Sequence, residues 1–119
     1  MVTYKLINYD DFSGEADLLV SDGTNELLCY SSSFSDNAKT LKIRTFLCDN
    51  IIRIDSVICP CQKQSGYYSY FLQGEVIDII NKIVSIGDIL IELDSDFPKN
   101  IINGEYVSFT VMRLDCTFI

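Results

Sequence analysis

Four of the six glycines in this chain are followed directly by an acidic residue, and each pair opens a run rich in branched or aromatic side chains. The pairs are Gly14-Glu15, Gly74-Glu75, Gly87-Asp88 and Gly104-Glu105. Glycine permits a tight turn, the acid stays solvated at the corner, and the residues that follow suit a strand. This punctuation predicts an all-β chain, folded as a small barrel or sandwich.

The most definite local pattern is a hairpin near the N-terminus. Residues 15–20 and 26–30 are predicted to be its strands, because the Asp22-Gly23 pair between them is a turn signal. The predicted inward positions of the first strand are Ala16, Leu18 and Val20. Residues 1–13, before the hairpin, are predicted to be an edge strand or a loosely docked arm.

Residues 41–47 alternate in the way expected of a half-buried strand. The predicted inward side chains are Leu41, Ile43, Thr45 and Leu47, and the predicted outward ones are Lys42, Arg44 and Phe46. Residues 51–59 and 67–72 are two more strand-like runs, with Phe71 expected in the core. The run 75–84 is open between a helix and strand-turn-strand, and its Ile and Val content favours the strands.

The C-terminal third carries two further strands around a turn. Predicted inward side chains are Ile89, Ile91 and Leu93 in the first strand and Val107, Phe109 and Val111 in the second, where Ser108 and Thr110 are expected to face outward. Residues 96–103 resemble a capped single helical turn with an early proline. We therefore expect residues 1–119 to form one domain. Its fold is expected to be a closed or partly open antiparallel barrel of five to seven strands, similar to an oligonucleotide/oligosaccharide-binding (OB) barrel.

The chain is acidic, with 17 acids against 9 Lys and Arg and a net charge of −8. Such a surface repels phosphate backbones and anionic membranes, and it favours a protein partner with a basic surface. No apolar run reaches the ~18 residues of a membrane span, and the polar, acidic opening is unlike a secretory signal. We therefore expect a cytoplasmic protein that does not bind membranes. The oligomeric state stays open.

The residue types needed for most enzyme chemistry are missing from the sequence. There is no histidine, which removes the commonest general base and a common zinc ligand, and there is no glycine-rich phosphate loop. Cys59-Pro60-Cys61 lacks the two-residue spacing typical of zinc or redox pairs, so inert thiols are favoured while a metal or redox role stays open. The expectation is a non-enzymatic protein with no catalytic residues, cofactor or metal site.

Two sets of residues are candidates for binding. Tyr67, Tyr68 and Tyr70 form a tyrosine-rich segment of the kind that anchors protein interfaces. With the acidic charge, they predict a module that binds or neutralises a basic protein partner. The alternative is an OB-like single-stranded nucleic-acid-binding protein that uses Lys42, Arg44, Phe46 and Arg53, since basic residues interleaved with an aromatic suit that ligand. The net charge disfavours the alternative.

Overall fold

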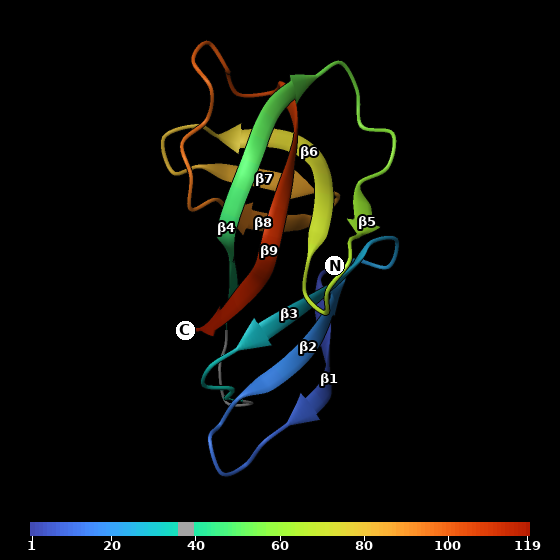
Figure 1. Ribbon diagram of the computed structural model, residues 1–119, viewed down its shortest axis with the longest axis vertical. Helices are drawn as coiled ribbons and strands as arrows, with labels where there is room; N and C mark the ends of the chain where they lie inside the picture. Colours follow the sequence, from blue (N-terminus) through green and yellow to red (C-terminus); the bar gives the residue numbers. More distant parts are fainter. Residues whose placement is uncertain (36–39) are drawn as a thin grey trace.

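The computed structural model describes residues 1–35 and 40–119, which form nine β-strands and, over these two ranges, no helix (Figure 1). The strands are β1 (Thr3–Tyr9), β2 (Ala16–Ser21), β3 (Glu26–Ser31), β4 (Leu41–Ile54), β5 (Cys61–Lys63), β6 (Tyr70–Asp78), β7 (Ile83–Ile86), β8 (Ile89–Glu92) and β9 (Tyr106–Phe118). The number of strands exceeds the five to seven expected because part of the N-terminal segment and Cys61–Lys63 also form strands.

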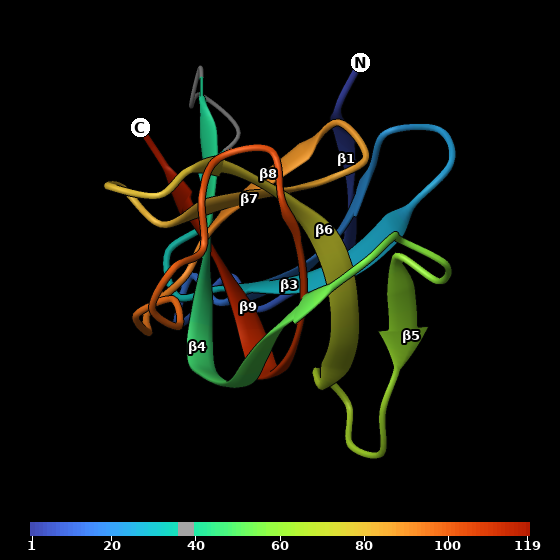
Figure 2. The ribbon, with the colours of Figure 1, turned by 90° about the horizontal axis from the view of Figure 1, so that it is seen from above.

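Five of the strands close into a barrel, which confirms the predicted small OB-like fold (Figure 2). The ring runs β4-β8-β7-β6-β9 and returns to β4, because β9 pairs with both β6 and β4. Four pairings are antiparallel, and β4 and β8 run parallel. A closed ring with an odd number of strands cannot alternate direction throughout, so at least one parallel pair is unavoidable.

The other strands extend the barrel at two places. β1, β2 and β3 form an antiparallel sheet that lies below the barrel in Figure 1, with β1 as its edge strand. This sheet joins the barrel where β3 meets β9, with Tyr30 opposite Asp115 in a parallel pairing. The three-residue strand β5 adds to the outside of β6.

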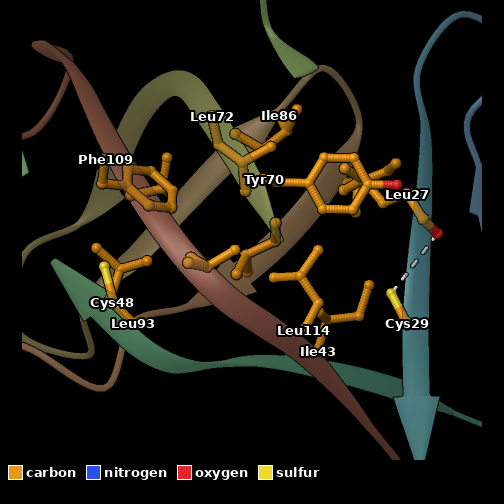
Figure 3. Packing of buried hydrophobic residues seen from close by; sticks show 14 of the residues in the cluster. Leu27, Cys29, Ile43, Cys48, Tyr70, Leu72, Ile86, Leu93, Phe109 and Leu114 are labelled. Atoms are coloured by element: carbon orange, nitrogen blue, oxygen red, sulfur yellow. Dashed lines mark hydrogen bonds between the residues drawn. The ribbon is translucent and has the colours of Figure 1, made fainter. Parts of the chain in front are cut away.

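A single apolar core runs from the barrel into the N-terminal sheet (Figure 3). Phe109 and Leu72 come from the barrel, whereas Leu18 and Leu27 come from the sheet, and all four are fully buried. The predicted inward positions of the first hairpin strand, of β8 and of β9 are confirmed. Ser108 is an exception, because it is buried although it was predicted to face outward.

Residues 41–54 form one long bent strand instead of two separate ones. The predicted alternation fails at Leu47, which has a φ of 55° and is 53% exposed, while Cys48 takes the buried position. Asp94 explains the break: its carboxylate accepts hydrogen bonds from the backbone N–H groups of Leu47 (2.9 Å) and Cys48 (3.0 Å). Partial burial on its own would raise the pKa of Asp94. The bonds from Leu47, Cys48 and Thr45 outweigh the effect of burial, so the pKa of Asp94 lies below its usual value.

Two other regions can be compared with the sequence predictions. Residues 75–84, which the sequence left open, adopt strand-turn-strand, with β6 ending at Asp78 and β7 starting at Ile83. The helical turn predicted over residues 96–103 does not form: these residues make turns without a helix, and Asn100 has a φ of 70°. That left-handed residue interrupts the helical turn that the proline and the cap would have started.

Candidate functional site

One face of the molecule carries a row of polar residues that crosses six strands. Residues opposite one another in a sheet share a face, and successive pairings link Asn8 (β1), Asp17 (β2), Tyr30 (β3), Asp115 (β9), Arg44 (β4) and Glu92 (β8). Of the predicted protein-binding tyrosines, Tyr67 and Tyr68 lie at the β1 end of this row, and the predicted nucleic-acid-binding residues Lys42, Arg44 and Phe46 lie at the β4 end. The structure therefore places two sites that the sequence treated separately on one surface.

Asp17 holds the exposed Tyr67 and the half-buried Tyr68 in place at the β1 end. The Tyr68 hydroxyl donates to Asp17 Oδ1 at 2.6 Å, and the Tyr67 hydroxyl donates to Asp17 Oδ2 at 3.3 Å. Asn8 Nδ2 donates to Asp17 Oδ2 (3.1 Å) and to the Tyr67 hydroxyl (3.2 Å). The rings of Tyr67 and Tyr68 meet edge to face, with centroids 4.7 Å apart. The pair is thus fixed by side chains of β1 and β2.

Tyr30 extends this aromatic group toward the barrel. Its ring meets Tyr68 edge to face at 5.9 Å, and its hydroxyl donates to Glu15. The Arg113 guanidinium lies over the ring of Tyr30 (4.6 Å) and over that of Phe46 (4.5 Å). Asp115 accepts two hydrogen bonds from Arg113, at 2.5 and 3.1 Å, which hold the guanidinium between the two rings.

A polar hollow of about 390 Å³ lies beside these tyrosines. We refer to its lining as the tyrosine–carboxylate surface, which is made of Asn8, Tyr9, Asp10, Glu15, Ala16, Asp17, Tyr30 and Tyr68. Burial, followed by the bond to Asp17, raises the pKa of Tyr68, and the bond to Glu15 raises that of Tyr30. Both phenols therefore stay protonated at neutral pH. The hollow thus presents three acids and three aromatic rings, a combination suited to an organic cation.

Tyr70 does not belong to this surface. It is 6% exposed, its ring lies in the core (Figure 3), and its hydroxyl accepts a hydrogen bond of 2.8 Å from the Leu28 N–H. Tyr70, predicted to bind a protein, is therefore turned away from the surface. Phe71, predicted to lie in the core, is only half-buried, because β6 turns Tyr70 and Leu72 inward. Tyr67, by contrast, is 54% exposed.

The predicted nucleic-acid-binding residues face carboxylates. Lys42 and Arg44 both contact Glu92, at 3.9 and 3.0 Å. Arg53 lies beyond the irregularity at Asp49–Ile52, where it pairs with Glu105 at 3.1 Å, so it is not grouped with Lys42 and Arg44. Phe46 is partly covered by Arg113. Lys42 and Arg44 thus share one carboxylate, and the positive charge at this end of the row is partly compensated by the protein itself.

Within the Cys59-Pro60-Cys61 segment, Cys61 is not an activated thiol. Burial, followed by the charge of Asp22, raises the pKa of Cys61 to about 11, so the thiolate is scarce at neutral pH. All five cysteines are free. Within residues 1–35 and 40–119, no group of three or more Cys, Asp or Glu side chains is arranged to hold a metal ion. No helix in the same ranges has the length and apolarity needed to cross a membrane.

Several residues of the tyrosine–carboxylate surface were not singled out from the sequence. Asp17 and Tyr30 sit opposite each other in the β2–β3 hairpin, so the predicted turn contained a signal for their pairing. The contacts that Tyr67 and Tyr68 make with Asp17 span about fifty residues and have no local signal. Comparisons with protein-family models, with curated proteins and with solved structures gave no match.

Proposed function

We propose that this protein is a non-enzymatic, cytoplasmic module that binds a protein partner through basic side chains. The observation that carries the proposal is the tyrosine–carboxylate surface, where Asp10, Glu15 and Asp17 surround one hollow with Tyr9, Tyr30 and Tyr68. The net charge of −8 adds long-range attraction for a basic partner and speeds its encounter.

The chemistry of recognition follows from the side chains that line the hollow. A lysine or arginine of the partner would rest on the face of a tyrosine ring and pair with a nearby carboxylate, and both contacts favour a cation. Tyr67 and Tyr68 are already fixed by Asp17, so little side-chain freedom is lost on binding. This preorganisation supports the proposal that the tyrosines bind a partner and are not merely surface residues.

The nucleic-acid alternative has weaker support. Lys42, Arg44 and Arg53 each face a carboxylate of the protein, so binding a phosphate backbone would require those ion pairs to break. Arg113, the cation that lies over Phe46, is itself paired with Asp115. The basic-partner proposal needs no such rearrangement.

The test is affinity capture on immobilised protein with identification of the retained proteins. A basic partner should bind at low salt and elute as salt rises, because exposed charge pairs are screened. Asp17→Asn should weaken binding by roughly tenfold, because it removes a charge and loosens both tyrosines. Asp96→Asn is the matched control: it makes the same charge change at an exposed site paired with Lys82 and should bind like the wild type.

Two results would contradict the proposal. One is the recovery of no specific partner at either salt concentration, and the other is equal binding by Asp17→Asn and the wild type. A fluorescent oligothymidylate provides the other arm of the experiment. Binding of this probe that falls in Lys42→Ala and Arg44→Ala would support the nucleic-acid alternative in place of the basic partner.

A further inference from the structure

The two ends of the strand order differ in how they are protected. The described strands run from β1 at one end to β5 at the other. β5 has three residues, which is too short to template another strand, whereas β1 has seven and all of them are exposed. Natural sheets usually shield a long edge with prolines, inward charges or short strands. β1 contains no proline, one lysine and one irregularity between Leu6 and Asn8.

Backbone groups of β1 face away from the sheet. The Asp10 N–H donates to the Glu15 carbonyl at 2.9 Å just beyond β1 and β2, so these two residues lie in the register of a hydrogen-bonded pair, although the Asp10 carbonyl accepts its bond from the Gly14 N–H. In an antiparallel ladder such pairs alternate with pairs whose N–H and C=O groups point outward. Tyr9, opposite Ala16, is therefore a residue whose backbone donor and acceptor face the free edge.

One face of β1 is apolar and only partly covered. Tyr4, Leu6 and Tyr9 lie opposite Val20, Leu18 and Ala16 and share their face, yet they remain 38–49% exposed. Phe34 packs edge to face with both Tyr4 (6.3 Å) and Tyr9 (5.7 Å). A cavity of about 400 Å³ adjoins this group, with Tyr4, Leu41, Leu90 and Phe118 in its lining. An added strand would cover this face with alternate side chains.

Charge selects the kind of strand that fits. Asp10 and Asp11 follow β1, and Asp88 lies near its start, where it contacts the N-terminal amine of Met1 at 3.7 Å. A second copy would bring another net charge of −8, so self-pairing is opposed by repulsion. On the face opposite Tyr4 and Tyr9, Asn8 contacts Tyr67 and Asp17, so that side of an added strand borders the tyrosine–carboxylate surface.

We propose that the basic partner docks by adding an extended segment to the free edge of β1. Its residues alternate: apolar side chains lie on the face of Tyr4, Leu6 and Tyr9, and lysines or arginines point the other way, toward Asp17. Main-chain hydrogen bonds to β1 supply affinity, and the alternating side chains supply specificity. This inference rests on the proposed function and specifies how the partner is bound.

The test uses a synthetic peptide of alternating lysine and valine, long enough to pair with all of β1, titrated into labelled protein and followed by NMR. The Tyr9 amide should become protected from hydrogen exchange when the peptide is bound. Tyr9→Pro should weaken binding at least roughly tenfold, the cost of about one lost backbone hydrogen bond. Tyr9→Ala is the matched control, because it removes the same ring and keeps the N–H, so it should bind clearly more tightly than Tyr9→Pro. A glutamate-valine peptide should not bind.

The possible outcomes separate this inference from the proposed function. Binding that is lost in Asp17→Asn, with no protection in β1 and no difference between Tyr9→Pro and Tyr9→Ala, overturns strand addition and leaves the proposed function standing. Protection in β1 with unchanged binding by Asp17→Asn supports strand addition and counts against the tyrosine–carboxylate surface. Absence of binding at low salt overturns strand addition. A dimer seen by light scattering and lost in Tyr9→Pro would replace the basic segment with a second copy.

Discussion

The barrel and the N-terminal sheet are built from similar strands, but the barrel closes into a ring and the sheet ends in an edge strand. In the barrel, ring closure gives β4, β6, β7, β8 and β9 a neighbour on each side, and the side chains turned inward are almost completely buried. In the sheet, β2 and β3 bury alternate residues, whereas β1 buries none. The comparison shows that most of the buried side chains belong to strands with two neighbours, while the outer strand of the sheet keeps one free edge.

The largest expected difference between the two regions is the loss of stability when an apolar side chain is removed. Phe109 is fully buried at the centre of the barrel, so Phe109→Ala should reduce the free energy of unfolding by about 4 kcal/mol. Tyr4 on β1 is partly exposed and contacts mainly other aromatic rings, so Tyr4→Ala should cost less than about 1.5 kcal/mol. Urea denaturation measures both. Equal costs would mean that β1 belongs to the stabilising core.

The second prediction concerns Asp94 at the bend of β4, where the stability of the barrel should depend on pH. In Asp94→Asn an amide nitrogen would face the Leu47 or Cys48 N–H, so we expect a loss of about 2 kcal/mol. Because folding lowers the pKa of Asp94, its stabilisation is complete above the unfolded pKa of about 4 and is lost as pH falls through the lower folded value.

The variant should therefore lose less stability than the wild type between pH 5 and acid, when the unfolding midpoint in urea is followed with pH. The control is Asp96→Asn, because Asp96 lies at the surface and pairs with Lys82. If the unfolding midpoint falls equally steeply with pH in Asp94→Asn and in the wild type, the ionised carboxylate of Asp94 does not stabilise the bend.

The smallest expected effect concerns how the sheet is attached to the barrel. Asp22, in the β2–β3 turn, accepts a hydrogen bond of 2.9 Å from the Asp88 N–H in the β7–β8 turn. A Cβ at Gly87 would overlap the Asp22 carboxylate and the Asn25 side chain. Gly87→Ala should cost about 1–2 kcal/mol and should speed hydrogen exchange in β2 and β3 more than in the barrel.

Gly104→Ala provides the comparison for Gly87→Ala. Gly104 also has a positive φ, of 93°, but a Cβ there would meet open space among the described residues. Its replacement therefore carries the backbone strain without disturbing Asp22. Uniform acceleration of exchange across both regions in Gly87→Ala would show that the turn contact is not what attaches the sheet.

Local patterns in the sequence were enough to predict the fold class and several strands. The Asp22-Gly23 turn located the first hairpin, and the alternation at Ile89, Ile91 and Leu93 gave the correct buried face of β8. These features depend on neighbours a few residues apart. The exchange of Leu47 for Cys48 in the core depends on Asp94, 47 positions away, and no local period contains that information.

In the candidate site, too, some features follow from neighbouring residues and others from contacts between distant parts of the chain. The exposure of Tyr67 and the burial of Tyr70 follow from where β6 begins, and Leu72 and Val76 in the same strand carried the signal for its inward face. The grouping of Tyr67 and Tyr68 with Asp17 requires the 64–69 loop to reach β2. Likewise, the compensation of Lys42 and Arg44 by Glu92 requires the parallel β4–β8 pairing. The second contact depends on closure of the barrel and the first on how the N-terminal sheet packs beside it, and the local sequence pattern contains neither.

The position of β9 in the ring has a consequence for how the chain folds as it is synthesised. β9 pairs with β4 and β6 and also meets β3, yet it leaves the ribosome after all three of them. Until residues 106–118 emerge, β4 and β6 lack the strand that joins them, and the apolar faces made earlier stay open to solvent. A ribosome that stalls before residues 106–118 emerge would therefore display an unclosed, aggregation-prone half-barrel.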